Sequence, residues 1–136
     1  MLLLIVTGII YLKILADNNY NFVYTLDDAY IHMAMAKNFA AFGVWGITPF
    51  EFTSSSSSII WTLMLSGFYF ALGPNQYLPI ILNLVFALLV LDASYRILKN
   101  RRLKSGAILF ILFLVIFVSP LPPLMFTGLE HVMHIW

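Results

Sequence analysis

Residues 77–98 read YLPIILNLVFALLVLDASYRIL, and this apolar stretch decides the fold. It is 22 residues long, and a helix needs about 20 apolar residues to cross the hydrocarbon core of a bilayer. Asp92 is its one acidic interruption, and Arg96 follows four residues later. Residues four apart share one face of a helix, so these two side chains can form an ion pair. The stretch therefore predicts a transmembrane helix.

The composition of the whole chain agrees with this assignment. Of 136 residues, 62% are hydrophobic and 10% are charged, whereas a soluble domain carries about 25% charged residues. The mean hydropathy is +0.94. We therefore expect an all-α integral membrane protein. A net charge of +1 gives no support to a nucleic-acid partner, and the lack of cysteine excludes disulfides and thiolate zinc sites.

The basic residues set the predicted topology. Five of the seven Lys/Arg residues lie between Arg96 and Lys104, and the positive-inside rule makes this loop cytoplasmic. The apolar run 59–72 is too short to span and is expected in the interface. We predict about three transmembrane helices, with the following layout: helices at 1–16, 77–98 and 106–119, an outer loop with juxtamembrane helices at 17–76, a cytoplasmic loop at 99–105, and an outer segment that starts a further helix at 120–136.

Two adjacent carboxylates, Asp27 and Asp28, are the first candidate site residues. Carboxylates beside membrane segments are costly unless they are used or paired. Acidic residues also stabilise the first turn of a helix, and local sequence favours that explanation as strongly as a catalytic role. In the predicted topology Glu130 reaches the same outer side as this pair. The three carboxylates, far apart in sequence, are expected at one membrane face.

A helix is predicted from about Asp27 to Phe42. Thr25-x-x-Asp28 resembles a capping box at its start, and Gly43 is a typical stop. The apolar side chains Ile31, Met35, Phe39 and Phe42 would lie on the membrane surface. Residues 53–58, one Thr and five Ser, are predicted to be a polar loop without a packing role.

A metal site is the weaker hypothesis. His131 and His134 are three residues apart, a spacing found in metal sites, and Glu130 precedes them. Without a third placed ligand, such residues are more often interfacial polar groups. Asp28, His32 and His131 are the weak metal candidates, with Asp28 and His32 four apart on one helix face. A divalent cation therefore stays open as a cofactor.

The order of these motifs resembles the N-terminal part of GT-C glycosyltransferases. The motifs that carry the resemblance are Leu-Asp-Asp-Ala-Tyr-Ile at 26–31, Ala-Lys-Asn-Phe-Ala at 36–40, Ile-Trp-Thr-Leu-Met-Leu at 60–65 and Thr-Gly-Leu-Glu-His at 127–131. The superfamily includes protein O-mannosyltransferases, lipid A aminoarabinose transferases and cell-wall arabinofuranosyltransferases. Its members run to several hundred residues, so the chain is expected to be an N-terminal fragment that is inactive alone.

The resemblance implies a polyprenyl-phosphate sugar as donor and a hydroxyl as acceptor, at the extracytoplasmic face of a bacterial plasma membrane. It places Asp27 and Asp28 as base or acceptor-organising carboxylates, with Glu130 at a later acidic position. The sugar and the acceptor stay open. The alternative is a small non-catalytic membrane protein that acts through partners. A transporter or channel fragment is less favoured, because the acids lie outside the spans except for Asp92.

Overall fold

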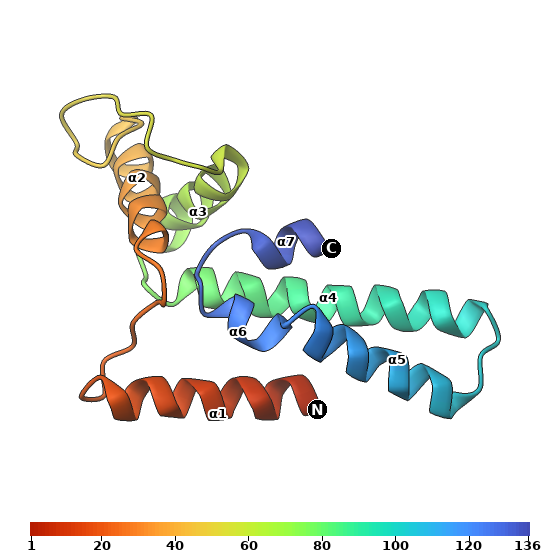
Figure 1. Ribbon diagram of the computed structural model, residues 1–136. Helices are drawn as coiled ribbons and strands as arrows, with labels where there is room; N and C mark the ends of the chain where they lie inside the picture. The colour runs from red at the N-terminus through yellow and green to blue at the C-terminus, as the bar shows by residue number, and fades with distance from the viewer.

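The computed structural model describes residues 1–136 and contains helices but no strands (Figure 1). The predicted all-helical fold is confirmed. Seven helices follow in chain order: α1 (Leu2–Asp17), α2 (Asp28–Phe42), α3 (Ile59–Leu72), α4 (Leu78–Asn100), α5 (Ser105–Val118), α6 (Leu121–Met125) and α7 (His131–Ile135).

One helix, α4, is long and apolar enough to cross a membrane. Its 23 residues extend about 35 Å at the usual rise, against a hydrocarbon core of about 30 Å. The other two predicted spans are shorter: α1 has 16 residues and α5 has 14. Of the three expected spans, α4 alone meets the length criterion. The ion pair predicted within it is present, with Arg96 Nε 2.7 Å from an Asp92 carboxylate oxygen.

The helices are arranged along α4 (Figure 1). After the basic turn, residues 101–104 with Arg101, Arg102 and Lys104, α5 runs back from the far end of α4, and α1 lies alongside. Helices α2 and α3 pack on each other and project from the other end of the molecule, where α4 begins. The basic turn and the α2–α3 pair therefore lie at opposite ends of α4.

Three apolar clusters hold this arrangement together. The largest gathers buried residues from α1, α4, α5, α6 and α7, including Leu3, Val90 and Met125. A second cluster joins α2, α3 and the start of α4 around Trp61. The third packs Phe22 and Tyr24 against Phe126. Large apolar side chains of α1 and α5 stay exposed nonetheless, which is the surface expected of helices that face lipid.

Helix α2 matches its predicted bounds to within one residue, but the capping predicted at its start is absent. It ends at Gly43, whose φ of 69° is left-handed and whose N–H donates to the Phe39 carbonyl over 3.0 Å. The capping-box prediction is wrong: Asp27 is the N-cap residue, with no side-chain cap, and the Thr25 hydroxyl donates to Phe126 instead. Met35 was expected on the membrane surface and is fully buried, because α3 packs against this helix.

Candidate functional site

Residues 126–130 are hydrogen-bonded to the loop before α2, from which they are separated by about 100 residues of sequence. The Thr25 N–H and hydroxyl both donate to the Phe126 carbonyl, over 3.1 and 3.2 Å. The indole N–H of Trp61 on α3 donates to the Gly128 carbonyl over 3.1 Å. These bonds place the segment that carries Glu130 between α2 and α3.

Gly128 allows this close approach. Its φ is +72°, a backbone conformation that residues other than glycine rarely adopt. A Cβ at this position would lie 2.7 Å from both the Ala29 Cβ and the Tyr24 ring. The segment therefore packs directly on the first turn of α2.

Asn83 on α4 holds the same segment from the opposite side. Its side-chain amide donates to the carbonyls of Leu129, over 3.0 Å, and of Met125, over 3.4 Å. Glu130 follows directly and is buried, with 7% of its surface exposed. Its Oε2 has no hydrogen-bond partner. A buried carboxylate oxygen without a partner is costly and marks a site where function can use it.

His32 on α2 is buried beneath the serine-rich loop. Its Nδ1 lies 2.9 Å from the Thr62 hydroxyl oxygen, and its Nε2 lies 3.2 Å from that of Ser57. Neutral imidazole donates from one ring nitrogen and accepts at the other, and a hydroxyl group can take either role. The loop thus offers a hydrogen-bond partner to both nitrogens of the neutral ring.

Two of the predicted carboxylates lie close enough to His32 to affect its charge. Burial lowers the pKa of His32 below its ordinary value of 6.5, while Glu130 and Asp28 act in the opposite direction. Burial dominates, so the imidazole is neutral near pH 7. Residues 126–130, which carry Glu130, thus pack on the start of α2, which carries Asp28 and His32, although Asp28 and Glu130 are about 100 residues apart.

Asp27 and Asp28 lie at the exposed N-terminal end of α2. The unpaired amides at this end carry partial positive charge, which stabilises carboxylates there. Both remain accessible, whereas Glu130 is enclosed. The two types of environment suit different tasks. An accessible carboxylate can take a proton from an incoming hydroxyl group, and an enclosed carboxylate can orient that hydroxyl group by accepting a hydrogen bond.

The two C-terminal histidines are exposed, although His131 directly follows the buried Glu130. His131 and His134 are exposed on the short α7. No group of three or more His, Asp or Glu side chains lies close enough to hold a metal ion. The weak metal candidates Asp28, His32 and His131 therefore do not form a ready ligand set.

Sequence reasoning missed the hydroxyl groups around His32. Residues 53–58 were predicted to be a loop without a packing role, yet Ser56 bonds to Thr62 over 2.9 Å and lies 3.3 Å from His32. Asn83 and Trp61 were missed as well. A polar Asn in the middle of an apolar helix was the one signal that could have indicated a buried contact.

Tyr24 anchors the loop before α2 to the start of α4. Its hydroxyl donates to the Gln76 carbonyl over 2.7 Å and accepts from the Ile80 N–H over 3.2 Å. Burial raises the pKa of this phenol well above its usual range. Tyr24 is therefore a neutral structural residue of the site.

No protein-family model, curated protein or solved structure matches this chain.

Proposed function

We propose that this chain belongs to a membrane glycosyltransferase of the GT-C type. It would transfer a sugar from a polyprenyl-phosphate donor to an acceptor hydroxyl at the extracytoplasmic face of a bacterial plasma membrane. The observation that supports this most is the packing of residues 126–130, which carry Glu130, on α3 and on the start of α2, which carries Asp28 and His32. The same motifs carry the sequence resemblance.

The proposed chemistry uses the exposed carboxylates. The acceptor oxygen attacks the anomeric carbon of the donor, and the bond from that carbon to the phosphate oxygen breaks. The lipid phosphate leaves with the electron pair, and a carboxylate, Asp28 or Asp27, takes the acceptor proton. Glu130 orients the acceptor from its enclosed position. A single base without a covalent intermediate inverts the anomeric configuration, as in inverting glycosidases.

The membrane placement in this proposal has its own support. The basic turn after α4 lies at the opposite end of that helix from α2 and α3 (Figure 1). If α4 spans the membrane with this turn in the cytoplasm, the carboxylates lie outside. Helix α1 and the α5–α6 region complete a multi-pass arrangement.

The test measures sugar transfer in membrane vesicles that contain the full-length enzyme to which this chain is proposed to belong. Labelled mannosyl, arabinofuranosyl and aminoarabinosyl polyprenyl phosphates serve as donors, with endogenous lipid and protein as acceptors. Asp28→Asn should reduce the rate by about a hundredfold or more, the usual effect of removing a general base. Glu130→Gln should reduce it as well, at unchanged protein level.

Glu51→Gln is the matched control, because Glu51 is an exposed carboxylate in the loop between α2 and α3 and has no part in the site. It should retain parental transfer. Parental rates in Asp27→Asn, Asp28→Asn and Glu130→Gln together would refute the proposal.

A non-catalytic membrane protein is the second candidate function. Phe50 and Phe52, in the loop between α2 and α3, are 90% and 72% exposed. Exposed aromatic side chains at a loop are typical of a surface that binds a partner. Membranes with the wild-type full-length protein that transfer no sugar from any donor would favour this candidate.

A further inference from the structure

We propose that the groove between α3 and α4 holds one acyl chain of an anionic membrane phospholipid, with its phosphate bound at Lys37. This inference rests on the proposed membrane placement of α4 and is independent of glycosyl transfer. The occupant is a lipid of the surrounding bilayer, separate from any substrate at the carboxylate site.

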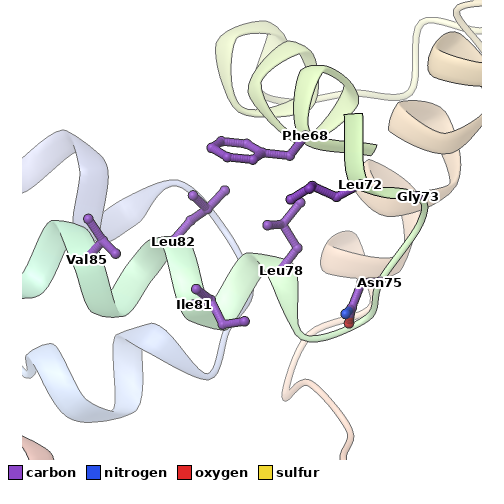
Figure 2. Close-up of a pocket in the computed structure, with 8 residues that line it drawn as sticks. All are labelled: Phe68, Leu72, Gly73, Asn75, Leu78, Ile81, Leu82 and Val85. Atoms are coloured by element: carbon purple, nitrogen blue, oxygen red, sulfur yellow. The ribbon is translucent and has the colours of Figure 1, made fainter. Parts of the chain in front are cut away.

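The groove is apolar and about 400 Å³ in volume, within the usual range for small-molecule sites. Figure 2 shows Phe68 and Leu72 of α3 on one side and the side chains of α4 on the other. Its apolar lining comprises Phe68, Leu72, Leu78, Ile81, Leu82 and Val85.

The direction of the groove fits a lipid chain. It follows α4 from Leu78, the first residue of the helix, to Val85. Seven residues of helix correspond to about 10 Å. In the proposed placement this path leads from the outer interface toward the middle of the bilayer, the direction an acyl chain takes.

A polar pocket of about 200 Å³ adjoins the outer end of the groove. Asn75 lines both cavities, and in Figure 2 its amide points away from the apolar side chains. The polar pocket is also lined by Lys37, Tyr69 and Gln76. The apolar groove therefore begins beside a pocket that contains hydrogen-bond donors and a positive charge.

Charge indicates an anionic headgroup. Lys37 is the only Lys or Arg between Lys13 and Arg96, and no acidic residue lines its pocket. The one ion pair in the structure is Asp92–Arg96, so Lys37 has no carboxylate partner. A cation at the interface beside an apolar groove matches the phosphate and chain of one phospholipid, whereas a free anion would make no use of the groove.

The experiment measures lipid binding to the purified full chain by native mass spectrometry, with phosphatidylglycerol and phosphatidylcholine as probes. One phosphatidylglycerol should bind more tightly than phosphatidylcholine. Lys37→Gln should weaken that first binding event about fivefold, the effect of one cation at an anionic surface. Ile81→Trp, at a half-exposed position in the groove, should weaken both lipids.

Lys13→Gln is the matched control and should bind phosphatidylglycerol as the parent does. Helical circular dichroism checks that each variant is folded. Equal binding by the parent and Lys37→Gln would overturn the proposal, as would competition by soluble glycerol phosphate at the same concentration. Much tighter binding of a polyprenyl phosphate would assign the groove to the donor instead. A protein that binds the lipid but transfers no sugar would support this inference and contradict the proposed function.

Discussion

His32 is a buried histidine whose two ring nitrogens both meet hydroxyl groups. This environment suits the neutral ring, which donates from one nitrogen and accepts at the other. A protonated ring would have to donate from both, and Ser57 would then have to turn its proton away. The serine-rich loop therefore stabilises one protonation state of His32.

The first prediction concerns pH. Because the pKa of folded His32 lies below 6.5, the unfolded chain binds a proton before the folded protein does. Stability from this group is present above about pH 6.5 and decreases as the pH falls through that value, levelling off below the folded-state pKa. Thermal unfolding in detergent, measured from about pH 8 to about pH 5, should show a falling melting temperature.

The matched variants are His32→Gln and His134→Gln. His32→Gln should be less stable throughout and should show a flatter dependence on pH over the upper part of this range. His134 is exposed on α7, so its variant should keep the parental slope. A slope that is the same in all three proteins would contradict the assignment of the neutral ring.

At the scale of elements, the site depends on one short connection, the residues between α6 and α7. Its backbone bonds to Thr25, Trp61 and Asn83, which belong to the loop before α2, to α3 and to α4. Gly128 is the point of closest approach. A short connection that is bonded to three elements sets their relative positions.

The second prediction tests this contact. Gly128→Ala should destabilise the fold by about 1–3 kcal/mol, because the added Cβ meets Ala29 and Tyr24 and the backbone is left-handed. Gly106→Ala is the control, since a Cβ there meets nothing within 4 Å and its φ is not left-handed. Denaturant unfolding in detergent measures both, and equal stability of the two variants would count against the packing described.

A third prediction concerns the polar residue of α4. Asn83→Leu removes both amide hydrogen bonds and leaves the Leu129 carbonyl buried without its donor. The expected loss is about 1–3 kcal/mol, the cost of an unsatisfied buried group. Asn100→Leu, at the far end of the same helix, should change stability little. The same unfolding assay distinguishes the two.

The helices were largely predictable from sequence, and the contacts between them were not. Apolar length and Gly43 defined α3, α4 and the end of α2, because these signals are local. The capping role of Thr25 was mispredicted, because its hydroxyl bonds to Phe126, a partner that no local pattern reveals. Asp28 and Glu130 were expected at one face, but the burial of His32 beneath the serine-rich loop depends on tertiary packing.

For the whole molecule, the separation between the basic turn and the α2–α3 pair predicts sidedness. The chain has no cysteine, so single cysteines can report topology without a background. Ser55→Cys and Ser105→Cys are matched, since both serines are exposed and uncharged. In intact bacterial cells a membrane-impermeant maleimide should label the Ser55→Cys variant. It should label the Ser105→Cys variant only after the cells are lysed.

The opposite labelling pattern would place the carboxylates in the cytoplasm and refute the proposed face of the reaction. Labelling of both cysteines in intact cells would contradict a membrane crossing between them.

The contact between Gly128 and the first turn of α2 also has a consequence for biosynthesis. Ribosomes add roughly 5–20 residues per second, so Asp28 emerges roughly 5–20 s before Glu130. Helices α2 and α3 are close in the chain and can pair during this interval, but the surface of Tyr24 and Ala29 that Gly128 later covers stays open. The nascent chain therefore keeps Glu130 apart from Asp27 and Asp28 until residues 126–130 have been made, and a translational pause before residue 126 would prolong that exposed state.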